Sequence, residues 1–348
     1  YKGIEQYFYI TIRSIIFKLI AFLLVFTCVK TENDYSAYAF IIIFATVGSG
    51  VVNLYNLRKI ITIKYFSNYD FKRHLKPMMT FFITTIAVAF YVNVSVALLG
   101  FIQGNEEVGY YNAAYRIKDV MVSIVTSLGA VLLPRLSYYI ENNMWDKFND
   151  ILSKSTQFIF ILSLPLVVFC ILFAKPSVLI LAGSAYSGSI VPLQVLALII
   201  FIVGLSNLTG IQMLIPLKKE KYLCYSVVIA AVINMLLNLI LIPEYGAIGA
   251  AVSVMISEAS ILIYQIYILR AYSQVLFGGV SYMRIIMALV LAISVSIWLN
   301  IKLNYNEIIV FLVSASLFFI CYFGVLLLSK EPFILTILNQ IRSKLTKN

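Results

Sequence analysis

The sequence predicts an all-α polytopic membrane protein, and composition, apolar run length and loop charge predict it together. Of its 348 residues, 62% are hydrophobic and only 12% are charged, whereas a soluble domain carries about 25% charged residues. One globular core cannot bury so much apolar sequence. Runs of about 20 apolar residues, each long enough for a helix to cross a bilayer, recur along the whole chain.

Ten runs qualify as membrane spans, and polar segments separate them in order. The acidic segment TENDY at 31–35 follows the first span, and the basic run KRHLK at 72–76 precedes the third. GNEE at 104–107 precedes the fourth span, which we expect to end at Pro134 because proline interrupts helices. The predicted spans are about 9–29, 37–56, 78–102, 112–134, 156–175, 188–214, 223–242, 246–269, 284–301 and 308–328.

The later spans have similar boundaries. Segment 138–155, with aromatic residues spaced along it, is expected to form a short interfacial helix before the fifth span. The basic segment KKEK at 218–221 precedes the seventh span, and PEYG at 243–246 separates the seventh from the eighth. The tail after residue 330 has one apolar and one basic face, which predicts a helix on the membrane surface.

Loop charge orients the spans. Loops on one side, with the start and the tail, hold nineteen Lys and Arg residues, and the other side holds only Lys30, Lys175 and Lys302. Cytoplasmic loops carry the excess of positive charge, so the first set and the C-terminus are predicted to be cytoplasmic. The net charge of +11 is therefore an orientation signal, and no nucleic-acid partner is expected.

The residues with catalytic chemistry are sparse. The chain has one histidine and four cysteines that are far apart in apolar runs, and it lacks a metal-ligand spacing or a Gly-rich phosphate loop. No loop is long enough for a catalytic domain. The sequence therefore predicts that the protein is not an enzyme and has no metal or cofactor.

Six charged residues inside predicted spans are not explained by bulk hydrophobicity, since a charge in hydrocarbon costs at least about 2.5 kcal/mol. Polar intramembrane residues of this kind usually mark a functional site or pathway. They are Arg13, Lys18, Arg116, Lys118, Asp119 and Glu258.

Arg13 and Lys18 belong to the first span. With a rise of about 1.5 Å per residue, Arg13 lies about 6 Å deep and Lys18 roughly 13–15 Å deep. Each side chain either extends back to the headgroups or faces a water-filled cavity, and the sequence leaves both open.

Arg116, Lys118 and Asp119 open the fourth span. Arg116 and Asp119 are three residues apart and within about 60° on one helix face, so we expect them to pair and to leave Lys118 free. One alternative is a self-neutralised outer turn from which Lys118 extends to solvent. The other is a positive cavity wall that suits phosphate or pyrophosphate.

Glu258 lies near the middle of the eighth span. A lone buried carboxylate is either protonated and hydrogen-bonded, or a coupling site for a proton or cation, and both readings stay open. The neutral residues Asn207, Gln212, Asn234 and Asn238 are expected to form hydrogen bonds between helices.

Four blocks in order along the chain carry a family resemblance: YKGIEQYFYITIRSIIFKL, EEVGYYNAAYRIKDVMVSIVTSLGAVLLPRLS, SNLTGIQMLIPLKKEK and YGAIGAAVSVMISE. Through them the chain resembles the polysaccharide (O-antigen-type) flippases of the MOP (multidrug/oligosaccharidyl-lipid/polysaccharide) exporter superfamily. The resemblance implies a MOP-type two-bundle transporter fold, with two six-helix bundles around a central cavity. The ten spans would be the fifth to fourteenth of that plan, with the first four missing.

The resemblance also implies a division into three parts. Residues 1–76 would hold the last two helices of the N-terminal bundle and a basic cytoplasmic linker. Residues 77–270 would form the six-helix C-terminal bundle, and 271–348 two extra helices with a basic cytoplasmic tail.

The implied function is translocation of undecaprenyl-pyrophosphate-linked oligosaccharide repeat units from the inner to the outer leaflet, for surface polysaccharide assembly. The implied location is the bacterial inner membrane, among membrane lipids and with a glycan polymerase and other glycan-assembly proteins as partners. Arg13, Lys18, Arg116 and Lys118 would bind the pyrophosphate during alternating access. Many relatives carry an acid near the position of Ser95, and its absence leaves Asp119 and Glu258 as the candidates for coupling to Na⁺ or H⁺.

Other functions fit the pattern less well. A cation-coupled multidrug exporter predicts acidic cavity residues, whereas basic residues outnumber acidic ones four to two inside these spans. A lipid II flippase of the same superfamily is a further alternative. A membrane-embedded glycan polymerase needs a large outer loop that the chain lacks, and an assembly scaffold would be recognised by its protein partners.

Overall fold

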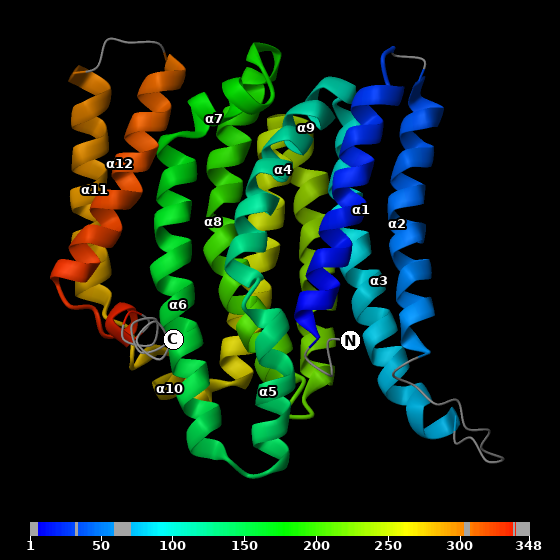
Figure 1. Ribbon diagram of the computed structural model, residues 1–348, viewed down its shortest axis with the longest axis vertical. Helices are drawn as coiled ribbons and strands as arrows, with labels where there is room; N and C mark the ends of the chain where they lie inside the picture. Colours follow the sequence, from blue (N-terminus) through cyan, green and yellow to red (C-terminus); the bar gives the residue numbers. More distant parts are fainter. Residues whose placement is uncertain (1–5, 32–33, 59–70, 303–306, 337, 339–348) are drawn as a thin grey trace. The chain divides into compact units, whose positions relative to one another are not determined.

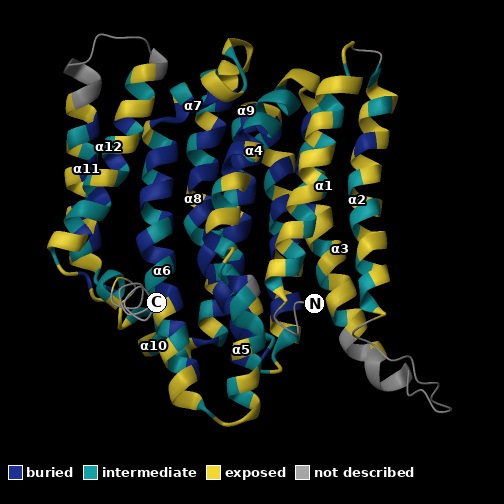
Figure 2. Cartoon of the chain, viewed as in Figure 1, coloured by how far each residue is buried: buried dark blue, intermediate teal, exposed yellow. Residues whose placement is uncertain are grey.

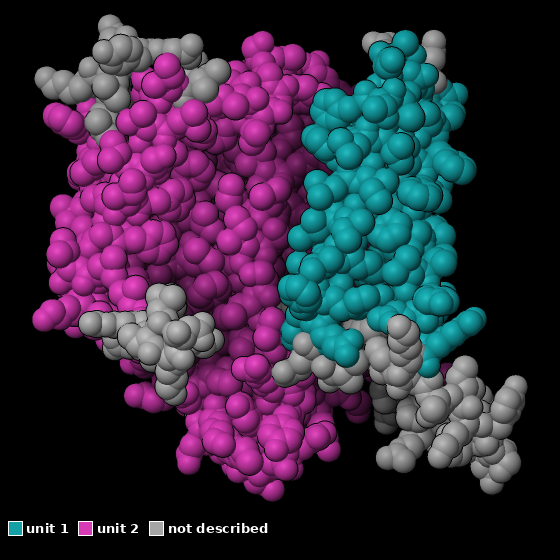
Figure 3. Space-filling view, viewed as in Figure 1, with its two compact units in different colours: residues 1–74 teal, residues 75–348 magenta. Residues whose placement is uncertain are grey.

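The computed structural model describes residues 6–31, 34–58, 71–302, 307–336 and 338. Within these ranges the chain folds into helices and their connections, without a β-strand (Figure 1). Contact density divides the chain into two compact units, residues 1–74 and 75–348, which Figure 3 colours separately. The predicted three-part division at residues 76 and 270 stays a prediction.

The first unit contains the antiparallel pair α1 (Tyr7–Cys28) and α2 (Tyr35–Leu57). The two helices approach closely at Gly48, where an added Cβ would lie 2.5 Å from the ring of Phe17. In the connecting turn the Asp34 carboxylate accepts hydrogen bonds from the backbone N–H groups of Lys30 and Thr31, at 3.0 and 2.9 Å. These bonds stabilise the charged form and hold the pKa of Asp34 below its usual value.

The second unit contains most of the helices. Its long helices alternate with short ones and with a 3-10 segment, η2 (Ser184–Ser189), and a π-helical segment, η3 (Leu208–Leu214). The α-helices are α3 (Phe71–Ile102, of which the unit takes the part from residue 75), α4 (Asn105–Thr126), α5 (Gly129–Glu141), α6 (Trp145–Leu172), α7 (Ala174–Leu181), α8 (Ile190–Asn207), α9 (Glu220–Ile268), α10 (Ser273–Phe277), α11 (Tyr282–Lys302) and α12 (Glu307–Leu328).

Helices α6 and α8 form the most buried part of the second unit (Figure 2). The close approach of α4, α6 and α8 depends on Gly204, where an added Cβ would lie 2.8 Å from Val125 and 3.1 Å from Ile159. Exposed hydrophobic residues cover the outer surface of the helices of this unit. Such a surface suits contact with lipid, which offers no hydrogen-bonding partners.

The helices confirm the predicted polytopic membrane architecture. Eight helical segments in the described ranges are long and apolar enough to cross a bilayer, or nine when the bent pair Arg270–Phe277 and Tyr282–Trp298 counts as one span. One of them, α9, contains both the seventh and the eighth predicted span. The predicted surface helix of the tail lies mostly outside the described residues.

Two predicted boundaries around the fourth span are wrong. Pro134 lies inside α5, which continues to Glu141, because a membrane helix tolerates proline when its surroundings satisfy the freed carbonyl. The helical hydrogen bonding is instead interrupted at residues 127–128, between α4 and α5, although both residues keep α-helical backbone angles. Segment 138–155 forms no separate interfacial helix: α5 and α6 meet at a tight turn, in which Asn143 has a φ of 55°.

Helix α9 is two helical segments that meet at Gly246. Its backbone there has φ 51° and ψ −128°, the conformation of the first central residue of a type II′ turn, which favours glycine. The turn lies in the predicted loop PEYG. The two segments of α9 place Asn234 and Glu258 at equal sequence distances on either side of Gly246.

Side chains from the α3–α4 connection and from the first turn of α4 bind both helix ends at this turn. The Gln103 side-chain amide donates to the carbonyls of Ile242 and Pro243, at 3.1 and 2.8 Å. The Glu107 carboxylate accepts from the backbone N–H of Ala247 at 2.6 Å. Gln103 thus satisfies carbonyls at the end of the first segment, and Glu107 caps the positive N-terminus of the second.

Replacing Gly246 should destabilise the protein. Gly246→Ala forces an L-residue into a positive-φ conformation beside the Glu107 side chain, which costs about 1–3 kcal/mol. The matched control is Gly324→Ala in α12, where an added Cβ meets nothing within 4 Å. Thermal unfolding of the purified protein in detergent should show a lower Tm for Gly246→Ala only. Equal Tm values for both variants would contradict this account of the turn.

Candidate functional site

Helix α4 carries the YRIKD cluster and has two polar faces. Arg116 is exposed on one face, and Lys118, two residues further on, is 4% exposed on the other. Each face borders a cavity. We call them the Arg116 cavity and the Glu258 cavity.

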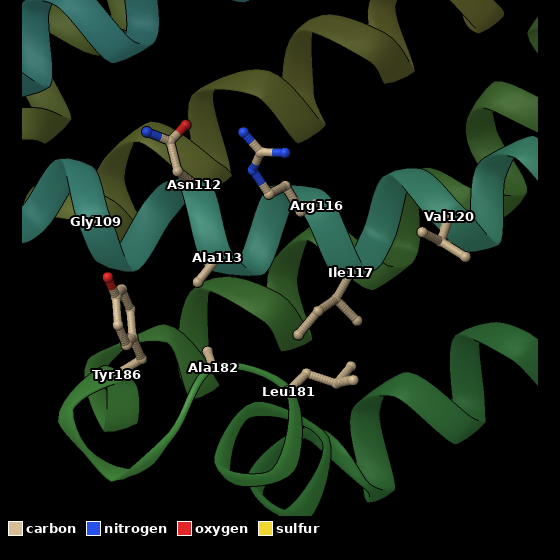
Figure 4. A pocket seen from close by; sticks show the side chains of 9 residues that line it. All are labelled: Gly109, Asn112, Ala113, Arg116, Ile117, Val120, Leu181, Ala182 and Tyr186. Atoms are coloured by element: carbon tan, nitrogen blue, oxygen red, sulfur yellow. The ribbon is translucent and has the colours of Figure 1, made fainter. Parts of the chain in front are cut away.

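The Arg116 cavity is the larger one, with a volume of about 600 Å³. In Figure 4 the Arg116 and Asn112 side chains extend to one side of α4, and Ala113 and Ile117 extend toward the loop that carries Leu181 and Ala182. Its lining contains one cation and no carboxylate. The full lining is Gly109, Asn112, Ala113, Arg116, Ile117, Val120, Leu181, Ala182 and Tyr186.

The Glu258 cavity lies inside the second unit and has a volume of about 110 Å³. Side chains from α3, α4, α8 and α9 enclose it, so it depends on the packing of four helices. It contains the charged groups of Lys118, Asp119 and Glu258, three tyrosines, and apolar residues. The lining is Tyr91, Val92, Tyr111, Tyr115, Lys118, Asp119, Val122, Ile199, Val203, Val254 and Glu258.

Lys118 makes its contacts in the Glu258 cavity. Its Nζ lies 3.7 Å from the centroid of the Tyr115 ring, a cation–π contact. The same atom lies 3.7 Å from Asp119 Oδ1, and Glu258 lines the same cavity. A buried ammonium requires such partners, because an unpaired charge is expensive to remove from water.

The predicted pairing of Asp119 with Arg116 is wrong. Asp119 forms its ion pair with Lys118, and Arg116 faces the other cavity. Helical angles place the Cβ atoms of Lys118 and Asp119 about 100° apart, but the long, flexible lysine side chain brings its Nζ to 3.7 Å from Asp119 Oδ1. The predicted extension of Lys118 to solvent is also wrong, since the residue is buried.

Glu258 is not a lone carboxylate. Its Oε1 accepts a hydrogen bond from the Tyr91 hydroxyl at 2.8 Å. One turn along α3, the Ser95 hydroxyl lies 3.2 Å from Asn234 Oδ1, to which it donates, and the Asn238 amide donates to Ser95 Oγ at 2.9 Å. The predicted interhelical hydrogen bonds of Asn234 and Asn238 are confirmed.

Arg13 and Lys18 belong to the first unit. The Arg13 guanidinium lies over the Tyr9 ring, 5.5 Å from its centroid, and Lys18 is exposed. The structure therefore brings Lys118, Asp119 and Glu258 together and gives Arg116 a separate cavity. The predicted roles of the six residues in substrate binding and ion coupling stay predictions.

Sequence reasoning missed Tyr91 and Tyr115. Both lie inside spans as aromatic residues, and an apolar run of this kind contains many tyrosines without a polar role. A signal was present in the spacing: Tyr91 and Ser95 are four residues apart and share a helix face, and Tyr115 stands three residues before Lys118.

The fold defines a class. Together with the span count, the helical architecture confirms an all-α, multi-pass membrane protein of the MOP type. The lipid II flippase MurJ in an inward closed conformation superimposes with a TM-score of 0.65 at 16% identity, over 92% of this chain and 67% of MurJ. At this identity the likeness carries the fold alone.

Sequence comparisons give the relatives. Residues 1–140 match the family described as polysaccharide biosynthesis protein. The chain is 28% identical over 269 residues to a "Putative O-antigen transporter" of Shigella dysenteriae, across 76% of this chain and 67% of that protein. A protein of the same name from Escherichia coli is 26% identical over 260 residues, across 74% and 62%. A "Probable low-salt glycan biosynthesis flippase" of Haloferax volcanii is 25% identical, across 51% and 37%.

The matches confirm the resemblance to the polysaccharide flippases of the MOP superfamily. The chain spans about two thirds or less of the length of these relatives. Their names are those of transporters and flippases rather than of catalytic enzymes, in agreement with the prediction that the chain is not an enzyme.

Removing the Tyr91 hydroxyl should destabilise the second unit. Tyr91→Phe leaves the buried Glu258 carboxylate without its donor, which costs about 1.5–3 kcal/mol. Tyr111→Phe is the matched control, because the Tyr111 hydroxyl lies in the same cavity, buried and without a hydrogen-bond partner among the described residues. Denaturant or thermal unfolding should show a lower stability for Tyr91→Phe and an unchanged or higher stability for Tyr111→Phe. The reverse order would contradict the Tyr91–Glu258 contact.

Proposed function

We propose that the protein is a flippase for lipid-linked oligosaccharides. It moves undecaprenyl-pyrophosphate-linked repeat units from the cytoplasmic to the outer leaflet of the bacterial inner membrane, for surface polysaccharide assembly. The names of its relatives support a glycan transporter. The loop charges support an orientation with the C-terminus in the cytoplasm.

The Arg116 cavity is the observation that carries this proposal. Its volume is typical of a site for a small organic group, and its lining combines one cation, the polar groups of Asn112 and Tyr186, and an apolar floor. A guanidinium binds phosphate oxygens through two parallel hydrogen bonds. Because no carboxylate competes in the lining, the cavity favours an anionic head group over a cationic drug.

Arg13 and Lys18 extend the proposal to the first unit. During alternating access, each basic residue would hold the pyrophosphate in turn while the lipid tail stays in the bilayer. The cost of a charge inside the membrane is then offset by substrate binding. Asp119 and Glu258 are the residues proposed for ion coupling. Lys118, also predicted to bind substrate, forms an ion pair with Asp119 and lines the same cavity as Glu258.

Lipid II transport is the weaker of the two flippase readings. The likeness to MurJ carries the fold alone, whereas the O-antigen transporter matches are higher in sequence identity. A glycan polymerase and further assembly proteins remain the partners that this function requires.

Replacing Arg116 should reduce transport. Arg116→Ala removes a charge-assisted contact worth about 1.5–3 kcal/mol, so surface glycan in a strain that depends on this protein should fall roughly tenfold or more. Arg116→Lys keeps the charge without the paired hydrogen bonds. Its surface glycan should therefore lie between that of Arg116→Ala and that of the unchanged protein. Surface glycan is measured at equal protein levels in the membrane.

The matched control is Arg270→Ala, which removes an arginine that lies over the Tyr267 ring, away from the Arg116 cavity. Its surface glycan should equal that of the unchanged protein. An unchanged amount of surface glycan for Arg116→Ala at normal protein levels would contradict the proposed role of the Arg116 cavity.

A further inference from the structure

The Glu258 cavity has the composition of a cation site. Two carboxylates and the face of the Tyr115 ring line the same small volume: Glu258 is buried, and the Asp119 side chain is 64% exposed. Carboxylate oxygens are hard ligands that suit alkali cations, and an aromatic face attracts a cation through its quadrupole. At about 110 Å³ the cavity is too small for a glycan head group, but it can hold a small ion with some water.

An ammonium group already borders this volume. Lys118 Nζ lies 3.7 Å from both the Tyr115 centroid and Asp119 Oδ1, and Glu258 lines the same cavity. The residue is 4% exposed, so its charge faces the cavity and not the surrounding solvent or lipid.

The surrounding helices supply no other cation. The lining contains tyrosines from α3 and α4, namely Tyr91, Tyr111 and Tyr115, and only apolar residues from α8. The Tyr91 hydroxyl donates a hydrogen bond to Glu258, but it carries no charge that would balance the carboxylate. Lys118 is therefore the positive charge that balances two acids within this lining.

We propose that Lys118 is a tethered counter-ion: its ammonium supplies the positive charge that a free monovalent cation would otherwise bring to Glu258 and Asp119. Sodium or potassium then gains little from entering the cavity, because Lys118 already balances the charge of the acids. Where the chain acts as the proposed flippase, this cavity does not couple transport to a metal cation. That consequence rests on the proposed function, whereas the cation-binding statement does not.

The direct test removes the tether. Lys118→Ala leaves two carboxylates without a balancing charge at an enlarged cavity, and should acquire binding of Na⁺ or K⁺. Purified protein is unfolded by heat at pH 8, in NaCl, KCl or choline chloride at constant ionic strength. The Tm of the unchanged protein should be the same in all three salts. That of Lys118→Ala should rise saturably with Na⁺ or K⁺, by roughly 5 °C at a hundredfold excess over the Kd.

Two controls isolate the cavity. Arg116→Ala has the same change in net charge on the other face of α4 and should show no response to the cation. Lys118→Ala combined with Glu258→Gln should lose the response, because one of the two carboxylates is neutral. The proposal is overturned if Lys118→Ala unfolds at the same temperature in sodium, potassium and choline, or if the unchanged protein responds as strongly.

A second measurement decides the case in which Lys118→Ala does not fold. Lys118→Met keeps most of the volume but leaves the acids unbalanced, so it should lose stability, and Lys118→Met with Glu258→Gln should recover most of the loss. Additive effects of the two substitutions would overturn the proposal. None of these readouts measures transport. A flippase assay can therefore contradict the proposed function while the role of Lys118 as counter-ion is supported, and the reverse result is equally distinguishable.

Discussion

The cost of burying charge governs how the second unit is built. Glu258 lies in the middle of a membrane span, where a carboxylate without partners is unfavourable by several kcal/mol (about 2.5 or more). Tyr91 donates a hydrogen bond to it, and Lys118 supplies a positive charge in the same cavity. These two partners come from α3 and α4, so a single buried acid on α9 requires three helices to keep their relative positions.

The turn at Gly246 makes that arrangement possible. Because the two segments of α9 meet there in a type II′ conformation, Asn234 and Glu258 both face α3, at Ser95 and Tyr91. Gln103 of the α3–α4 connection and Glu107 of the first turn of α4 bind the turn. The same connection starts α4, whose opposite faces then carry the buried Lys118 and the exposed Arg116. Helix α4 thereby separates the ammonium of Lys118, which contacts other groups of the protein, from the guanidinium of Arg116, which is accessible to a ligand.

Much of this fold could be predicted from sequence, and the limits have physical causes. Run length and loop charge predicted the spans, because hydrocarbon thickness fixes helix length. They could not decide whether Pro134 ends a helix, since that depends on neighbours which satisfy the backbone. Within the site, the sequence identified every charged residue of the Glu258 cavity. It gave Asp119 the wrong partner. Helical angles give only the directions of the Cβ atoms, and the ammonium group of a lysine lies far from its Cβ atom. Tyr91 and Tyr115 acquire their roles only through packing.

The central claim is that α4 has one closed and one open polar face, and cysteine accessibility tests it most directly. In a version without the four native cysteines, Asn112→Cys and Arg116→Cys report on the Arg116 cavity, and Tyr115→Cys and Lys118→Cys on the Glu258 cavity. A small maleimide is added to membranes, and the rate of labelling is measured at each position. The account predicts fast labelling at positions 112 and 116 and much slower labelling at 115 and 118. Equal rates at all four positions would contradict it.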